Sequence, residues 1–221
     1  MEIKNLSTAP LGDSLFIKPM EIRYTINGHE RKWDYIECHN SVAIIIFNVS
    51  RRTLVCVKQF RPAVYVQNIP LQDRNGPIDL VKYPPNLGIT VEFCAGIVDK
   101  NKSLREIAKE EVLEETGYDV SIENLHEIKV FKSNVGTAVD EIHLFYTEVD
   151  DSMKKGDGGG LEDEGEYIEV VELTLEEARQ ICEQTTTLNN YCGFLYGLLW
   201  FLHNKSAYFH QTCSQSSTLE N

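Results

Sequence analysis

Hydrophobic and polar residues alternate near the start of the chain, in EIRYTINGHERKWDYIEC (21–38), on both sides of Asn27-Gly28. Alternation around a two-residue Asn-Gly turn predicts a β-hairpin. Two β-branched runs follow, SVAIIIFNV (41–49) and TLVCVKQFRP (53–62). Their continuous apolar character predicts two buried strands joined by a tight turn.

The next part of the chain, residues 63–90, has no such periodicity and contains several prolines. We expect a long surface insertion there, which either closes over a site or only covers the surface. Strand character returns in TVEFCAGIVD (90–99). A helix is predicted from about Ser103 to Glu115, because Gly117 is a typical residue just beyond a helix end.

The C-terminal part of the chain contains further predicted strands and two closing helices. The strands are at 127–133, 141–149 and 167–173, and the helices are at 175–184 and 189–204. An acidic, glycine-rich loop, DDSMKKGDGGGLEDEGE (150–166), separates the last two strands. The pattern predicts an α+β protein in three parts: a small N-terminal antiparallel β-segment (1–38), a main domain (39–205) and a C-terminal tail (206–221).

Composition and charge narrow the class of protein. Of the 221 residues 42% are hydrophobic, and the formal net charge of −13 argues against binding to the nucleic-acid backbone. No hydrophobic signal region is visible, and the longest apolar run (192–202) is shorter than the roughly 18 residues of a membrane span. The six cysteines lack CxxC spacing, as expected for free thiols in a reducing compartment. We therefore expect a cytoplasmic protein that binds neither nucleic acid nor membrane.

Two acids interrupt the apolar face of the predicted helix 103–115. Successive side chains of a helix are about 100° apart, so Glu111 and Glu115 share one stripe with four apolar residues. These four are Leu104, Ile107, Ala108 and Val112. Unpaired carboxylates buried there would cost several kcal/mol or stay protonated. No Lys or Arg of the helix shares the stripe, which favours a hard cation such as Mg²⁺ or Mn²⁺. The alternative is an acidic flank that is simply solvated.

The stretch AGIVDKNKSLREIAKEEVLEETGY (95–118) resembles the signature of the Nudix hydrolases, G-x5-E-x7-R-E-U-x-E-E-x-G-U, where U is aliphatic or aromatic. The matching positions are Gly96, Glu111, Glu114, Glu115, Gly117 and Tyr118. Two positions depart from the signature, since Lys102 replaces its first Glu and Glu110 replaces its Arg. The resemblance implies that the Glu and Arg of the signature form an ion pair that holds the loop against the helix. We therefore expect Lys102 and Glu110 to form the same pair with the two charges exchanged.

The resemblance covers residues from about 20 to 180 and extends to the nucleoside-diphosphate-sugar branch of the family, most closely its UDP-sugar diphosphatases. The segment VKQFRPAVY (57–65) and the loop before YIEVV (167–171) carry it. It implies an α/β/α sandwich with a mixed sheet, a homodimer, and hydrolysis of a phosphoanhydride with Mg²⁺, Mn²⁺ being a possible substitute. The implied substrate is a nucleoside diphosphate sugar.

The resemblance also implies roles for particular residues. The expected metal ligands are Glu111, Glu114, Glu115 and the backbone carbonyl of Ala95. Glu164 and Glu166 are equal candidates for the base that activates water, and Glu114 is a further catalytic candidate. The expected substrate contacts are Arg61 for the phosphates, Glu92 near the metal and the sugar end, and Trp33 for the base of the substrate bound to the partner subunit.

The identity of the base and sugar is open at this stage. Relatives that cleave ADP-ribose usually carry an S-P-G turn soon after the signature, whereas this chain has Ser133-Asn134-Val135-Gly136. This favours UDP-glucose, cleaved to UMP and glucose 1-phosphate, over ADP-ribose, cleaved to AMP and ribose 5-phosphate. The third alternative is a nucleotide-binding module without activity, although such modules typically lack one or more of the signature acids.

Overall fold

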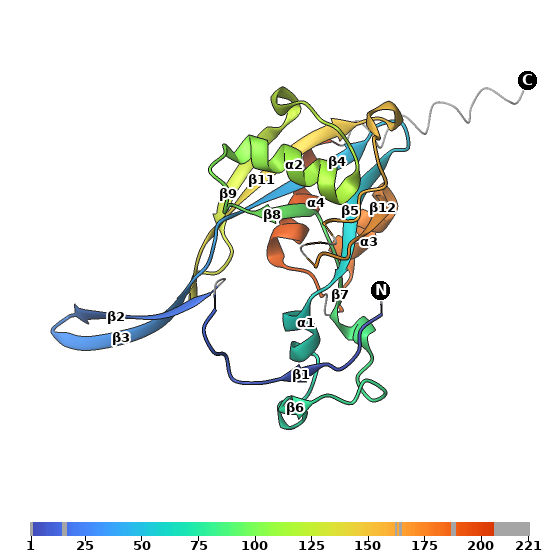
Figure 1. Cartoon of the computed structure of the whole chain (residues 1–221). Coiled ribbons are helices and arrows are strands. Elements are labelled where there is room, and N and C mark those ends of the chain that lie inside the picture. Colours follow the sequence, from blue (N-terminus) through green and yellow to red (C-terminus); the bar gives the residue numbers. More distant parts are fainter. Residues whose placement is uncertain (1, 15–16, 162, 164, 187–188, 206–221) are drawn as a thin grey trace, which may run out of the picture.

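A mixed seven-stranded β-sheet forms the centre of the computed structural model, which describes residues 2–14, 17–161, 163, 165–186 and 189–205 (Figure 1). Five strands follow the order β12-β5-β4-β11-β9, while β7 pairs with β5 and β8 with β4. The bounds are β4 (Ser41–Asn48), β5 (Thr53–Phe60), β7 (Ile89–Glu92), β8 (Cys94–Ile97), β9 (His126–Lys132), β11 (Glu141–Val149) and β12 (Glu169–Thr174). Strand β4 runs parallel to β11 and antiparallel to β5 and β8.

Helices cover both faces of this sheet, which confirms the predicted α/β/α sandwich. They are α2 (Leu104–Thr116) on one face, and α3 (Leu175–Glu183) and α4 (Cys192–Asn204) on the other. Along β4, Val42 and Ile44 pack toward α2, whereas Ala43 and Ile45 pack toward α4. The continuous apolar run of β4 follows from this double burial, because both of its faces lie in a core.

The strand character predicted for 90–99 is confirmed, but it belongs to two strands, β7 and β8, rather than to one continuous strand. Strand β7 pairs with β5, and β8 pairs with β4, so the chain changes partner between them. Phe93, at the change, is buried against Phe194 of α4, with ring centroids 4.7 Å apart. The break therefore inserts an aromatic side chain into the core below the sheet.

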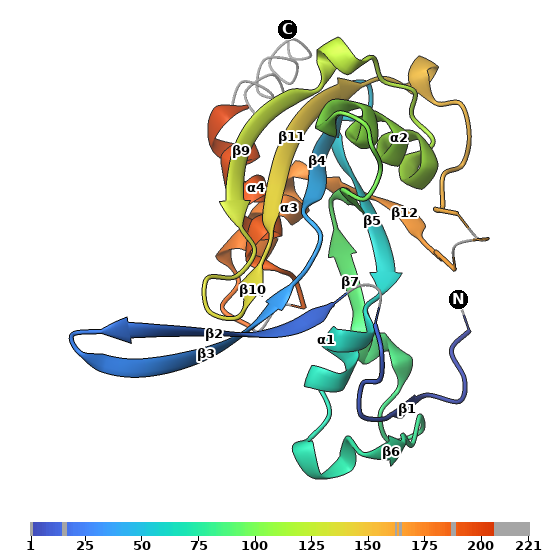
Figure 2. The same cartoon turned by 60° about the vertical axis from the view of Figure 1, so that its left-hand side comes forward.

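The predicted hairpin consists of β2 (Lys18–Ile26) and β3 (His29–Glu37), and it projects from the body of the molecule (Figure 2). Asn27 and Gly28 at its turn both have left-handed backbone angles, φ 51° and 79°. Such a pair matches the twist of the two strands. A short strand that the sequence analysis missed, β10 (Ala138–Val139), pairs in parallel with β3.

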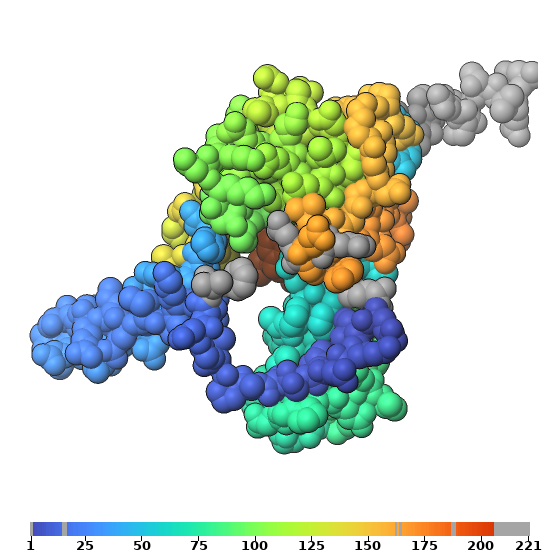
Figure 3. Space-filling view, viewed as in Figure 1, coloured from blue at the N-terminus to red at the C-terminus, as the bar shows by residue number. Residues whose placement is uncertain are grey.

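Residues 62–88 form a small lobe with a core of its own rather than a plain surface insertion. Its elements are α1 (Pro62–Gln67), the 3₁₀ turns η1 (Leu71–Asp73) and η2 (Pro85–Gly88), and β6 (Gly76–Pro77). Tyr65, Ile69 and Ile78 are buried in it. The N-terminal strand β1 (Ser7–Thr8) pairs with β6, and residues 2–14 run across the lobe (Figure 3).

Helix α2 begins and ends with strong local signals. Ser103 caps its first turn in a reciprocal capping box with Glu106, and Gly117 ends it in the left-handed conformation with φ 74°. Two further 3₁₀ turns lie at Ile122–Asn124 (η3) and Asp151–Met153 (η4). Within the described residues no helix is long and apolar enough to cross a membrane, and all five cysteines found there are free.

Replacing Gly117 with Ala should destabilise the protein by about 2 kcal/mol, measured by urea denaturation. The methyl group would be placed at left-handed φ and only 2.1 Å from the carbonyl oxygen of Gly156. Gly156→Ala is the matched control, because Gly156 has no positive φ and its methyl group would meet nothing within 4 Å. Equal denaturation midpoints for the two variants would contradict this account of the helix end.

Candidate active site

A cavity of about 960 Å³ lies where the start of β8, helix α2 and the lobe face one another. This volume is at the upper end of the range for sites that bind small molecules. Six of the residues expected to form the metal and substrate site line it. These six are Arg61, Glu92, Ala95, Glu111, Glu114 and Glu115, and the loop residue Glu166 joins them. The tertiary structure thus brings together seven candidates from five separate parts of the chain.

Glu115 is the most deeply buried acid of the cavity, with a residue exposure of only 3%. Its Oε2 atom accepts a hydrogen bond from the backbone N–H of Ala95 at 3.0 Å. Burial raises the pKa of Glu115 to about 8, although hydrogen bonds from Cys94 and Ala95 oppose the rise and Glu111 and Glu166 add to it. Such a carboxyl group binds a proton readily unless another cation takes its place.

Glu111 lies one turn earlier on α2, and its carboxyl group packs against β8. Burial, followed by the charges of Glu114 and Glu166, raises the pKa of Glu111 to about 7. A methyl group on Gly96 would come within 2.1 Å of the Glu111 side chain. Glycine at position 96 therefore leaves the space that the carboxylate occupies.

Of the two loop acids that are candidates for the base, Glu166 lines the cavity, whereas Glu164 lies outside the described residues. The Oε2 atom of Glu166 accepts a hydrogen bond from the backbone N–H of Leu161 at 3.2 Å. Because its charge contributes to the raised pKa of both Glu111 and Glu115, the Glu166 carboxylate lies in the electrostatic range of the α2 acids.

Arg61 and Glu92, the two expected substrate contacts, are bonded to each other across the cavity wall. Arg61 donates from Nε to Oε1 of Glu92 at 2.9 Å and from Nη2 to Oε2 at 2.7 Å. Glu92 also accepts from the hydroxyl of Thr90 at 2.6 Å. Burial would raise the pKa of Glu92, but the bonds from Arg61 and Thr90 lower it overall. The pair leaves other N–H groups of the guanidinium available to a ligand.

Trp33 is not brought to this cavity within one chain. It lies on β3 with 53% of its surface exposed, and its Nε1 donates to the carbonyl of Gly136 at 2.6 Å. Its expected contact with the substrate of a partner subunit stays a prediction.

The reversed ion pair between Lys102 and Glu110 is confirmed. Lys102 Nζ pairs with Oε1 of Glu110, and Lys100 Nζ lies 3.9 Å from the other oxygen of the same carboxylate. The loop before α2 is thus braced against the helix despite both departures from the signature. Lys100, which the sequence analysis did not single out, also lines the cavity.

The cavity has an amide-rich side that the sequence analysis missed. It consists of Gln59, Gln67, Asn68, Asn189 and Asn190. The side chain of Asn68 donates to the carbonyl of Leu87 at 2.9 Å and to Oδ1 of Asn189 at 3.2 Å, which links the lobe to the segment before α4. Asn189-Asn190 begin the helix predicted at 189–204, but α4 itself starts only at Cys192, so the two amides lie outside the helix, where they line the cavity.

The donor set of the cavity suits a hard cation by its chemistry. Carboxylate and carbonyl oxygens are the ligands that Mg²⁺ prefers. Burial first, and neighbouring acids second, raise the pKa of Glu111 and Glu115, so a bound cation would stabilise their ionised forms. Among the residues that the structure describes, no three Asp, Glu, His or Cys side chains converge closely enough to hold an ion as they stand. Binding would therefore draw the acids together, because without a cation like charges repel.

Sequence comparison identifies close relatives, although no family model matches the chain. The chain is 37% identical over 210 residues to the uridine diphosphate glucose pyrophosphatase of Bos taurus, covering 90% of this chain and 94% of the relative. The same enzyme of Mus musculus is 37% identical over 198 residues, covering 85% and 89%. The GDP-mannose pyrophosphatase of Salmonella typhimurium is 34% identical over 142 residues, covering 64% and 63%.

Proposed function

The chain belongs to the Nudix family of sugar-nucleotide pyrophosphatases, and we propose that it hydrolyses nucleoside diphosphate sugars at their diphosphate bond with the help of Mg²⁺. UDP-glucose is the proposed substrate, and UMP and glucose 1-phosphate are the proposed products. The single observation that carries the proposal is the cavity in which three signature acids, Arg61 and Glu166 meet.

The proposed ligands of the metal are Glu111, Glu114, Glu115 and the carbonyl oxygen of Ala95. When bound, Mg²⁺ supplies positive charge that neutralises the diphosphate and polarises the scissile phosphate. The acids of α2 would hold it from one side of the cavity. Manganese has the same preference for oxygen ligands and is proposed as a substitute.

Glu166 is proposed as the base that accepts a proton from the attacking water, with Glu164 as the alternative and Glu114 as a further candidate for this role. Glu166 lies on the loop rather than on the helix, so it can approach the water from a different direction than the metal ligands. Arg61 is proposed to donate its remaining N–H groups to phosphate oxygens, because the planar guanidinium group presents paired donors that match phosphate geometry. Its two hydrogen bonds to Glu92 hold the guanidinium group in one orientation.

The proposed choice of UDP-glucose is supported by the two mammalian relatives and by the absence of proline from the turn 133–136. The bacterial relatives act on GDP-mannose, which makes that compound the most informative competitor. ADP-ribose is the remaining competitor from the sequence analysis. We also propose a cytoplasmic location, in agreement with the free thiols.

A homodimer is proposed on the basis of the β2–β3 hairpin. Alternate residues of β2 present an apolar row that this chain leaves exposed. The row consists of Met20, Ile22, Tyr24 and Ile26, with Trp33 opposite Ile22 on β3. A row of this kind on a projecting hairpin is typical of an interface, and a second copy of the chain is its proposed occupant. In such a dimer Trp33 would reach the partner's cavity.

A phosphate-release assay coupled to a phosphatase tests the substrate directly. UDP-glucose, GDP-mannose and ADP-ribose are compared at equal concentration with Mg²⁺ and with chelator. We expect kcat/KM for UDP-glucose to exceed the other two by at least about tenfold, because each differing contact contributes about 1.4 kcal/mol or more. Chelator should abolish release from all three. Preference for another compound would overturn the substrate proposal, and release in chelator would overturn the metal proposal.

A further inference from the structure

The last turn of α2 is held by the glycine-rich loop that follows β11. The final four carbonyl groups of an α-helix have no partner within the helix. In α2 the carbonyl of Leu113 accepts from Gly117 N–H, and the loop supplies donors for the other three. These bonds are Gly160 N–H to Glu114 O (3.2 Å), Gly159 N–H to Glu115 O (2.9 Å) and Lys154 Nζ to Thr116 O (2.7 Å). Two of them act on the residues that carry the proposed metal ligands.

The same glycine segment also holds Glu166. The carbonyl of Gly159 accepts from the N–H of Ile168 at 3.1 Å. Leu161, next in the chain after Gly160, exchanges two bonds with Glu166, since its carbonyl accepts from Glu166 N–H at 3.1 Å and its N–H donates to the Glu166 carboxylate at 3.2 Å. Gly159 is therefore bonded to Glu115 on one side and to Ile168, the residue just before β12, on the other.

Glycine is required at this contact by both space and backbone angle. Gly158, Gly159 and Gly160 are consecutive residues with φ of 73°, 114° and 80°. A methyl group on Gly158 would lie 2.3 Å from the carbonyl oxygen of Glu115. On Gly160 it would lie 2.9 Å from the Cβ atom of Glu166. Any larger residue would therefore push the loop away from α2 or displace Glu166.

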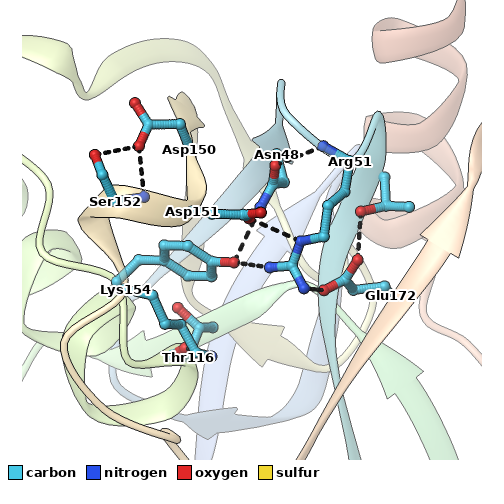
Figure 4. A network of polar contacts seen from close by, with 10 residues as sticks. Asn48, Arg51, Thr116, Asp150, Asp151, Ser152, Lys154 and Glu172 are labelled. Atoms are coloured by element: carbon cyan, nitrogen blue, oxygen red, sulfur yellow. Dashed lines mark hydrogen bonds and ion pairs between the residues drawn. The ribbon is translucent and has the colours of Figure 1, made fainter.

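The beginning of the loop is fixed independently, as Figure 4 shows. Asp151 accepts from the side-chain amide of Asn48 at 2.8 Å and pairs with Nε of Arg51 at 2.9 Å. Arg51 also pairs with Glu172 of β12 at 2.5 Å. The loop is thus tied to the β4–β5 turn before it reaches the end of α2, so its position is set by the sheet.

We propose that Gly158–Gly160 is a positioning segment, which sets the distance between Glu166 and the acids of α2 through the carbonyls of Glu114 and Glu115. The inference rests on the proposed function, because it assigns the two groups of acids to one reaction. It predicts that shifting the loop affects turnover more than binding. A displacement of about 1 Å from a reacting geometry can cost roughly a hundredfold in rate.

Gly158→Ala tests the proposal against the matched variant Gly165→Ala. Gly165 lies in the same loop with φ 79°, but its methyl group would meet nothing within 4 Å. We expect kcat for UDP-glucose to fall about a hundredfold in Gly158→Ala and less than about fivefold in Gly165→Ala. KM, and the affinity for Mn²⁺ titrated without substrate, should stay within about threefold of wild type. Equal kcat values in the two variants, or loss of Mn²⁺ binding in Gly158→Ala, would overturn the positioning role.

Hydrogen exchange of the wild-type protein provides a second test that needs no variant and no catalysis. The backbone amides of Gly159 and Gly160 should exchange as slowly as those of the last turn of α2, because they donate to its carbonyls. Exchange at the rate of an exposed loop would overturn the proposal. A wild-type protein that hydrolyses no nucleoside diphosphate sugar would instead contradict the proposed function, so the two failures are distinguishable.

Discussion

Glu115→Gln is expected to lower kcat by about a thousandfold or more with Mg²⁺ present, because an amide removes the charge that a hard cation requires. Glu115 accepts a hydrogen bond from the N–H of Ala95 and is almost fully buried. A glutamine has the same size, so the packing below it is retained. Steady-state kinetics with UDP-glucose measures the effect, and Glu111→Gln should show a loss of similar size.

Glu183→Gln is the control for this substitution. Glu183 is an exposed residue at the end of α3 and does not line the cavity. Its variant should have the same kcat as the wild type within about twofold. Turnover by Glu115→Gln within tenfold of the wild type would show that the carboxylate of Glu115 is no metal ligand.

The metal-free protein is expected to lose stability as the pH rises from about 5 to about 8. Glu115 and Glu111 have folded-state pKa values of about 8 and about 7, above the ordinary value of 4.5. The folded protein therefore binds more protons than the unfolded protein in this interval, and its free energy of unfolding falls as they are released. Glu92 does not oppose this fall, because its pKa is lowered and its contribution is lost only at more acidic pH.

Glu115→Gln should remove the larger share of this pH dependence, because an amide does not titrate, whereas Glu111 keeps its own share. In chelator at pH 8.5 the variant should be more stable than the wild type by of the order of 3 kcal/mol. Urea denaturation at several pH values measures both proteins. At pH 8, Mg²⁺ should restore the free energy of unfolding of the wild type and leave that of the variant nearly unchanged. Parallel pH profiles for the two proteins would contradict the raised pKa of Glu115.

Local patterns predicted the secondary structure well where the signal repeats over several residues. Strand β11 has the predicted bounds, Glu141–Val149, and helix α2 differs from its prediction by one residue at each end. The two acids in the apolar stripe of α2 do face the cavity, because helical periodicity fixes side-chain direction without reference to the rest of the fold. Glu115 is buried as expected from its place in that stripe.

Local sequence patterns did not predict the interactions between distant parts of the chain. The change of partner at Phe93 depends on where β4 and β5 lie, and the core of the lobe depends on the N-terminal segment. Arg61 and Glu92 were each assigned to the substrate, and only the pairing of β5 with β7 brings them into contact.

The amino-acid order thus specifies which side chains can do chemistry, because residue type and helical or strand spacing are local properties. Their arrangement is a property of the folded chain. The loop glycines illustrate the difference, since their sequence indicates only a left-handed turn. Their hydrogen bonds to the carbonyls of Glu114 and Glu115 arise because the sheet holds the loop against the end of α2. A contact of this kind depends on the packing of segments more than forty residues apart, which no short sequence window contains.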